Sequence, residues 1–319
     1  MGDCGETDGA AVPEWAQHAL GARPLSLEQQ ALSQSGNEVY RAHMPDGRSR
    51  VLRISAHARA FAHTRANLAT LRALGLPVQT VLAEGATPQG GAYVVLDWLP
   101  GRDLYYVLAE LSRAQAERIA STVTAFQHRV AEHVTVPQTG RFGWAPRIGE
   151  RAQYAAWSEV FGAPMPQEAL AAMRDRPDVT PLDHCRARLA LVRASLEDYF
   201  AALQPVCFLH DLTVKNVLVD GGELSGLIDF DSVCYGDPMM VVGVTLAHLE
   251  ADVGEAGRIY GEALMRCWHV QGERLRAAAF YAALWATGFV SIALGAGDHE
   301  RVKAVVPVAQ RLLTMAEGA

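Results

Sequence analysis

The sequence predicts an α+β fold, with strands concentrated in the first hundred residues and helices in the remainder. Three observations support this prediction. Apolar alternation and turn signals recur before residue 100, whereas apolar residues recur at helical spacing after Gly101. A strand, a Gly-Gly turn and a second strand then interrupt the helical part at residues 217–228.

The composition is that of an ordinary globular protein, because 50% of the 319 residues are hydrophobic and 20% are charged. A net charge of −7 argues against a nucleic-acid-binding surface, which is usually basic. The apolar run at 277–294 is interrupted by polar residues, so no membrane span is expected. The N-terminus lacks a basic start followed by an apolar stretch, and a cytoplasmic location without a secretory signal is expected. The five cysteines contain no CxxC pair, which disfavours a disulfide framework or a zinc site.

Residues 1–12 are expected to be disordered, and the rest of the first hundred residues are expected to form a strand-rich module. Residues 13–20 favour a short helix because a proline stands at its start. The next elements expected are a hairpin with an Asp-Gly turn, a helix that ends at a glycine, and two further strands. Their ranges are 38–44 paired with 49–55, then 60–75, 78–85 and 90–101.

After Gly101 the pattern becomes helical. A helix is expected at 112–133, where Ser112 is a good N-cap and the apolar residues share one face. Residues 136–146 are expected to form a loop, residues 151–203 two or three helices, and residues from 239 onward helices to the end.

Polar residues are set into the apolar stretch "CFLHDLTVKNVLVDGGELSGLIDFDSVCYGDP", residues 207–238. Asp211 precedes Asn216 by five residues, and Asp229 directly follows an expected strand. Carboxylates at the ends of buried strands are costly unless they hold a charged group. Asp and Asn are also common in turns, but their joint spacing with the Gly-Asp-Pro at 236–238 favours a functional site over separate turn residues.

This stretch resembles the aminoglycoside phosphotransferase family of small-molecule kinases, and residues 93–104 resemble the inter-lobe hinge of that family. The resemblance implies a bilobal protein-kinase-like fold. Its strand-rich, nucleotide-binding N-lobe would cover residues 13–97. Its mostly helical C-lobe, with the catalytic loop and the substrate site, would cover residues 98–319.

The resemblance also implies roles for the polar residues. Asp211 would accept the proton of the attacking hydroxyl, and Asn216 and Asp229 would hold Mg²⁺ through hard oxygen ligands. Three neighbours, His210, Lys215 and Asp231, are possible supporting residues. His210 is equally compatible with a hydrogen-bonded core residue, Lys215 with a surface lysine, and Asp231 with a solvated loop residue or a position near a second metal.

The nucleotide would be ATP or GTP, and its expected contacts depart from the kinase pattern. The strand cation that binds phosphate in kinases is Arg53, and Asn67 stands where a helix glutamate is expected. The glycine-rich loop is reduced to one glycine. The expected nucleotide-binding residues are Ser35, Gly36, Arg53, Asp97, Trp98 and Leu99.

The phosphate acceptor is expected to be a hydroxyl of a small molecule, most simply an antibiotic such as an aminoglycoside, with antibiotic resistance as the consequence. A metabolite kinase of the choline or sugar type, or a non-catalytic nucleotide-binding regulator, are the alternatives. Residues considered for the acceptor are Glu150, Tyr154, Trp157 and Glu262. Each is also compatible with a structural position, because charged helix faces are normally solvated.

Overall fold

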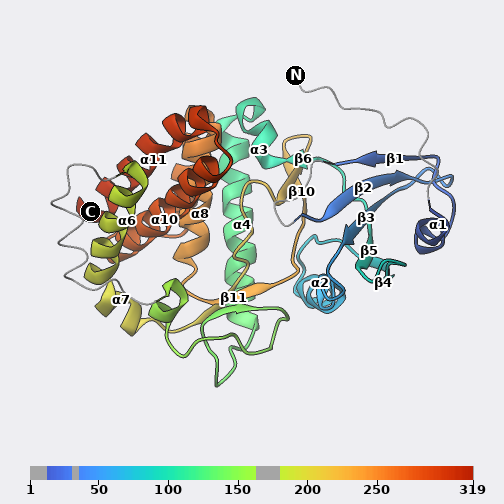
Figure 1. Cartoon of the computed structure of the whole chain (residues 1–319), viewed down its shortest axis with the longest axis horizontal. Coiled ribbons are helices and arrows are strands. Elements are labelled where there is room, and N and C mark those ends of the chain that lie inside the picture. The colour runs from blue at the N-terminus through green and yellow to red at the C-terminus, as the bar shows by residue number, and fades with distance from the viewer. Residues whose placement is uncertain (1–12, 31–35, 163–179, 319) are drawn as a thin grey trace. The chain divides into compact units, whose positions relative to one another are not determined.

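The computed structural model describes residues 13–30, 36–162 and 180–318. The chain divides into two compact units (Figure 1). Unit 1 comprises residues 1–100 and 226–232, and unit 2 comprises residues 101–225 and 233–319. The expected disordered segment, residues 1–12, lies outside the described residues. The short return of the chain to unit 1 at 226–232 was not predicted, and it carries two of the candidate acidic residues.

Unit 1 is built on a five-stranded antiparallel sheet with the strand order β1-β2-β3-β5-β4. Its strands are β1 (Ser26–Gln29), β2 (Glu38–His43), β3 (Ser49–Ser55), β4 (Val81–Ala86) and β5 (Ala92–Asp97). The β2–β3 hairpin forms because its turn contains Gly47 at φ 79°, a conformation that suits glycine. Strand β1 was not predicted, since its polar sequence shows no apolar alternation.

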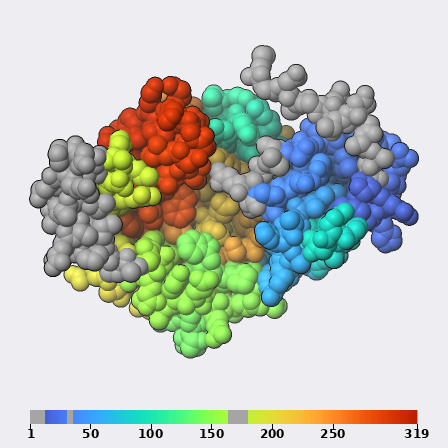
Figure 2. All heavy atoms as spheres, in the orientation of Figure 1, coloured from blue at the N-terminus to red at the C-terminus, as the bar shows by residue number. Residues whose placement is uncertain are grey.

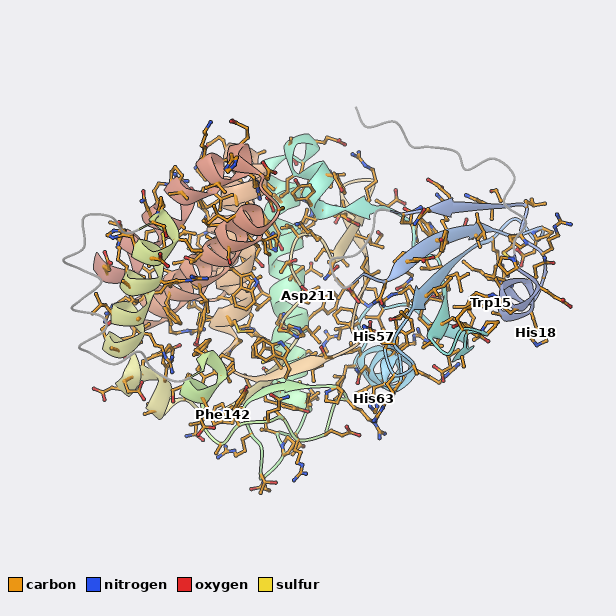
Figure 3. The ribbon with its side chains drawn as sticks, in the orientation of Figure 1. Trp15, His18, His57, His63, Phe142 and Asp211 are labelled. Atoms are coloured by element: carbon orange, nitrogen blue, oxygen red, sulfur yellow. The ribbon has the colours of Figure 1, made fainter. Side chains whose placement is uncertain are left out.

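Helices α1 (Glu14–Leu20) and α2 (Thr64–Ala73) complete unit 1. Helix α1 places Ala16, Ala19 and Leu20 in a core cluster with residues of β3 and β5. Trp15, labelled in Figure 3, packs its ring 5.6 Å from the ring of Tyr93. Segment 226–232 joins this unit through the N–H of Leu227, which donates to the Pro77 oxygen at 2.9 Å. This bond fixes the returning segment to the stretch of chain between α2 and β4.

Unit 2 is mainly helical. Its long helix α4 (Arg113–His133) begins at Ser112, whose side chain accepts from the N–H of Gln115 in a capping box. The other helices among the described residues of this unit are α3 (Leu104–Val107), α6 (Pro181–Ser195), α7 (Glu197–Ala202), α8 (Met239–His248), α9 (Glu255–Cys267), α10 (Glu273–Gly295) and α11 (His299–Gly318). Short 3-10 turns occur at Leu108–Glu110 and Trp157–Phe161, and a π-helical turn, η3, at Leu249–Val253.

Two three-stranded sheets accompany the helices of unit 2. One has the order β10-β9-β6, and its predicted hairpin joins β9 (Val217–Asp220) to β10 (Glu223–Leu227), with β6 (Arg102–Asp103) on the other side of β9. The hairpin turn uses two glycines at positive φ. The other sheet has the order β7-β11-β8, formed by β7 (Gly143–Ala145), β8 (Val206–Phe208) and β11 (Val233–Gly236). This second sheet was not predicted, because its whole β7 strand lies in the expected loop 136–146.

Within the described part of the chain, one helix, α10, is long and apolar enough to cross a membrane by length and composition. The sequence predicted no such run because polar residues interrupt it. Helix α10 packs against α8 and α11, and 61% of its most apolar window is buried inside the protein. Its apolar composition is therefore accounted for by the core of unit 2. The atoms of α11, red in Figure 2, lie at the surface of this unit.

Candidate active site

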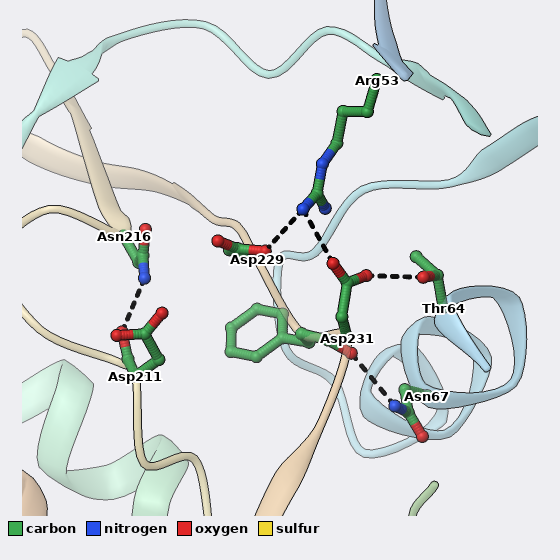
Figure 4. Close-up of polar contacts among 8 residues, drawn as sticks. Arg53, Thr64, Asn67, Asp211, Asn216, Asp229 and Asp231 are labelled. Atoms are coloured by element: carbon green, nitrogen blue, oxygen red, sulfur yellow. Dashed lines mark hydrogen bonds and ion pairs between the residues drawn. The ribbon is translucent and has the colours of Figure 1, made fainter. Parts of the chain in front are cut away.

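Arg53 is the centre of a polar cluster in unit 1 (Figure 4). It lies on β3, and only 9% of the residue is exposed. One terminal nitrogen of its guanidinium donates to Asp229 Oδ1 at 3.0 Å and to Asp231 Oδ2 at 2.7 Å. Burial opposes the charge of Arg53, but the two carboxylates outweigh it and raise its pKa. The guanidinium also lies 5.0 Å from the centre of the Phe61 ring.

Asp231 is fixed from two sides. Its Oδ2 accepts from Arg53, while its Oδ1 accepts from the Thr64 hydroxyl at 2.5 Å, at the start of α2. Burial raises the pKa of Asp231 and the charge of Asp229 adds to the rise, whereas Arg53 and Thr64 act in the opposite direction. The structure therefore places Asp231 in contact with protein donors on both of its oxygens.

Asn67 occupies the helix position where a glutamate was expected from the kinase pattern. The residue is fully buried, and its Nδ2 donates to the main-chain oxygen of Phe230 at 3.1 Å. Asn67 therefore ties α2 to the backbone between Asp229 and Asp231. Its neutral amide makes this bond without the cost of burying an additional charge.

Asp229 has an unusual backbone. Its φ is 68°, in the left-handed region that few residues other than glycine adopt. Such strained conformations persist only where the surroundings hold them, and they concentrate at functional sites. The Asp229 side chain is 39% exposed, in contrast to 25% for Asp231. Asp229 is therefore the more accessible of the two carboxylates.

Asp211 and Asn216 belong to unit 2, in the loop between β8 and β9 (Figure 3 labels Asp211). The Nδ2 of Asn216 donates to the main-chain oxygen of Asp211 at 2.7 Å. The start of this loop is fixed to α4 by Gln127, which exchanges two hydrogen bonds of 2.8 and 2.9 Å with the backbone of Leu209. Gln127 was missed in the sequence, because a buried glutamine in an amphipathic helix gives no local signal of its partner.

The supporting residues His210 and Lys215 make contacts within unit 2. The ring of His210 lies edge-on to the ring of Trp144, with the centroids 6.0 Å apart. Lys215 Nζ is 3.5 Å from Asp252 Oδ2 and 5.5 Å from the centre of the Tyr105 ring. Its charge also lowers the pKa of Asp103, although burial is the larger effect and raises that pKa to about 6.

Asp252 was not singled out in the sequence. It lies in the π-helical turn η3 and accepts from His248 Nδ1 at 3.0 Å, and it is also paired with Arg301. Burial acts to raise its pKa, but the hydrogen bonds from His248 and Arg301 and the charge of Lys215 hold the pKa at about 2. The spacing of His248 and Asp252, four residues apart, was the one local signal of this cluster.

Asp237, from the Gly-Asp-Pro sequence, is buried in unit 2. Its Oδ2 accepts from the hydroxyls of Tyr199 and Tyr281, each at 2.9 Å, and its Oδ1 accepts from the N–H of Met239 at 2.9 Å. The Tyr281 oxygen accepts in turn from the indole N–H of Trp157 at 2.6 Å. Burial raises the pKa of Asp237, against the effect of these hydrogen bonds. The buried carboxylate of this motif therefore connects Tyr199, Tyr281 and the start of α8 within unit 2.

The expected nucleotide-binding residues are distributed as follows. Ser35 lies outside the described residues, and Gly36 has a φ of 74°. The Asp97 side chain accepts from the N–H of Thr80 at 2.5 Å, and the Trp98 ring lies 4.1 Å below the guanidinium of Arg41. The Leu99 side chain packs against Gly226, where an added Cβ would lie 2.6 Å from Leu99 Cδ1.

The structure does not gather the four acceptor candidates into one cluster. Trp157 is fully buried, and its ring is not available for stacking on a ligand. Glu262 pairs with Arg258 on α9, and Glu150 with Arg147. Tyr154 forms an isolated strand-like bridge with Phe142. Trp157 was considered as a stacking surface for the acceptor, but the aromatic core of unit 2 encloses it.

Mg²⁺ prefers hard oxygen ligands, and Asn216 in unit 2 and Asp229 in unit 1 each carry oxygen atoms of this kind. The amide nitrogen of Asn216 donates to the Asp211 main-chain oxygen, so this bond does not use the amide oxygen of Asn216. Asp229 presents a carboxylate that is 39% exposed. Among the described residues, no group of three or more His, Cys, Asp or Glu side chains gathers into a metal site. Mg²⁺ at phosphate-binding sites usually takes one or two protein side chains, with phosphate and water as the other ligands.

The family model of the phosphotransferase enzyme family matches residues 28–286 of the chain. No curated protein matches the sequence significantly.

Several solved structures share the fold. A thermostable mutant of aminoglycoside phosphotransferase APH(4)-Ia, in a ternary complex with AMP-PNP and hygromycin B, has a TM-score of 0.71 and 18% identity, and covers 97% of this chain and 100% of that chain. Aminoglycoside 2'-phosphotransferase-IIIa, in complex with GDP, has a TM-score of 0.59 and 15% identity, with coverage of 91% and 93%. A putative fructosamine-3-kinase from Haemophilus somnus 129PT has a TM-score of 0.55 and 12% identity, with 94% of each chain covered. The predicted kinase-like α+β fold is confirmed.

Proposed function

We propose that this chain, which belongs to the phosphotransferase enzyme family and is a small-molecule kinase, transfers the terminal phosphoryl group of ATP to a hydroxyl of an antibiotic such as an aminoglycoside. The reaction would form a bond between the acceptor oxygen and phosphorus and break the bond between phosphorus and the ADP oxygen. We place this activity in the cytoplasm, where ATP is available.

The observation that carries the proposal is the loop between β8 and β9. Asp211 and Asn216 lie five residues apart, as in kinase catalytic loops, and the Asn216 amide holds the Asp211 backbone by a 2.7 Å hydrogen bond. In the proposed reaction Asp211 takes the proton that leaves the acceptor hydroxyl. Gln127 supports this role because it fixes the backbone of Leu209, two residues before Asp211.

Mg²⁺, when bound, would neutralise the charge of the nucleotide phosphates. Asn216 and Asp229 are the residues we propose to hold it. Arg53 would donate to a phosphate oxygen through its guanidinium, which suits phosphate geometry. The left-handed backbone of Asp229 supports its assignment as a metal ligand, since strain of this kind is retained where function requires it.

The choice of acceptor rests on charge and on the fold relatives. A net charge of −7 favours the approach of a cationic acceptor such as an aminoglycoside. The relative with the TM-score of 0.71 was solved with the aminoglycoside hygromycin B. The fructosamine-3-kinase relative supports a metabolite kinase as the second candidate.

The test is ADP release by the purified protein with ATP and Mg²⁺ over a panel of acceptors. The panel contains aminoglycosides, macrolides, choline and sugars, with a no-acceptor control. We expect release that depends on an aminoglycoside. If ADP release occurs with choline or a sugar and with no antibiotic, the acceptor is a metabolite and the chain is a metabolite kinase. ATP binding without acceptor-dependent release for any compound would support the non-catalytic regulator.

A further inference from the structure

Kinases orient their phosphate-binding strand cation by pairing it with a carboxylate on the following helix. In this chain the helix position carries Asn67, whose buried amide is used by the Phe230 oxygen at 3.1 Å. Asn67 is neutral, so its side chain does not supply the negative charge with which a carboxylate pairs with a guanidinium. The carboxylate partners of the strand cation, Arg53, therefore come from outside this helix.

Two carboxylates contact Arg53, and they differ in their surroundings. Asp231 is the nearer, at 2.7 Å against 3.0 Å for Asp229, and the less exposed of the two. Its second oxygen is bonded to Thr64 at 2.5 Å. Both Asp231 oxygens are thus engaged by protein donors, one from β3 and one from the start of α2.

Asp229 is in a different situation. It is 39% exposed, and it is the residue that the proposed function assigns to Mg²⁺. A metal ion and a guanidinium would compete for the Oδ1 of Asp229, which Arg53 occupies in this structure. A second carboxylate that keeps the guanidinium in place lets Asp229 exchange its cation without releasing Arg53 into the solvent.

We propose that Asp231 is the positioning residue for Arg53, in place of the helix carboxylate that Asn67 has replaced. Thr64 fixes the Asp231 carboxylate, Asp231 holds the guanidinium, and the guanidinium contacts the nucleotide phosphate while Asp229 is free to bind Mg²⁺. This inference rests on the proposed function, because it assumes that Arg53 and Asp229 serve the nucleotide and its metal.

The inference has a specific consequence. Without the charge of Asp231, Arg53 has Asp229 as its remaining carboxylate partner in this cluster, and the guanidinium then competes more strongly with Mg²⁺. Asp231→Asn keeps the shape of the side chain and removes the charge. The variant should weaken Mg·ATP binding by about tenfold, the effect of losing one hydrogen bond between charged groups. It should also raise the Mg²⁺ concentration that half-maximal ATP binding requires.

The experiment measures ATP affinity by isothermal titration calorimetry at a series of Mg²⁺ concentrations. The proteins are the wild type, Asp231→Asn, Arg53→Gln and the double variant. Glu84→Gln is the matched control, because Glu84 forms an exposed ion pair with Arg65 in the same unit. Thr64→Val is the second test variant. It leaves every charge in place and loosens the Asp231 carboxylate, so it decides the question if Asp231→Asn does not fold.

The inference requires that Asp231→Asn has less than about a twofold effect once Arg53 is already Gln, since the two residues act as one unit. Thr64→Val should weaken binding in the same direction as Asp231→Asn, and Glu84→Gln should have no effect. A full Asp231→Asn effect that persists in the Arg53→Gln protein would overturn the inference and indicate that Asp231 is a metal ligand. The inference would also be overturned if Asp231→Asn and Thr64→Val bound Mg·ATP with the same affinity as the Glu84→Gln control. Failure of the wild type to bind Mg·ATP would instead refute the proposed function.

Discussion

Asp252→Asn is expected to destabilise unit 2 in a way that depends on pH. Asp252 accepts from His248 at 3.0 Å, is paired with Arg301, and lies 3.5 Å from Lys215. These contacts outweigh the effect of burial and hold its pKa at about 2, below the ordinary 3.8. Because one pKa unit corresponds to about 1.4 kcal/mol, the charged form of Asp252 contributes about 2 kcal/mol at neutral pH.

The sign of the pH dependence follows from the direction of this change. The folded-state pKa is lower than the unfolded-state pKa, so the stabilisation is fully present above about pH 4. It is lost as pH falls from about 3.8 to below about 2, where the carboxyl group is protonated in both states. The wild type should therefore lose its advantage over Asp252→Asn in strong acid.

Urea unfolding of the wild type and Asp252→Asn, followed by circular dichroism at pH 7 and at about pH 2.5, measures this difference. We expect the free energy of unfolding to differ by about 2 kcal/mol at pH 7 and by much less in acid. Glu300→Gln is a suitable control, since Glu300 forms an exposed i,i+3 pair with Lys303. A variant as stable as the wild type at pH 7, or a deficit that does not change with pH, would refute the reasoning.

Three further changes test other parts of the account. Asp237→Ala leaves the buried Tyr281 hydroxyl and the Met239 N–H without their acceptor. It should lower the free energy of unfolding, measured by urea titration, by about 2 to 6 kcal/mol. An unchanged unfolding midpoint would show that water replaces the carboxylate. Gly236→Ala would place a Cβ 2.2 Å from the Trp157 ring, at a φ of 149°, and should lower the melting temperature. Gly90→Ala is the control for the loss of a glycine at positive φ, because its added Cβ would meet no atom within 4 Å. Asp229→Asn should abolish the Mg²⁺ dependence of ATP binding measured by calorimetry, and a retained dependence would contradict the metal assignment.

The elements with strong local signals could be predicted from the sequence. The β2–β3 hairpin has an Asp-Gly turn, α4 has a serine cap, and the β9–β10 hairpin has two adjacent glycines at its turn. Each of these signals acts over a few residues, so it can be recognised without knowledge of the tertiary structure. The sheet formed by β7, β8 and β11 could not be predicted. Its strands have three or four residues, and the paired residues lie 26 to 30 positions apart for β8 and β11 and 88 to 92 positions apart for β7 and β11.

The candidate site shows the same division. The spacing of Asp211, Asn216 and Asp229 is a local property, whereas the partners that hold them come from distant segments. Arg53 and Asp231 are 178 residues apart, and Gln127 and Leu209 are 82 apart. Trp157 was considered for the acceptor as a stacking surface, and only the packing of unit 2 shows that it is buried.

The measurement that tests the central claim most directly is mass spectrometry of the acceptor after incubation with ATP, Mg²⁺ and either the wild type or Asp211→Asn. If Asp211 accepts the acceptor proton, the wild type should yield a singly phosphorylated product. Asp211→Asn should yield it about 100- to 10,000-fold more slowly, with ATP binding unchanged. A phosphorylated acceptor formed at the same rate by both proteins would contradict the assignment of Asp211 as the base.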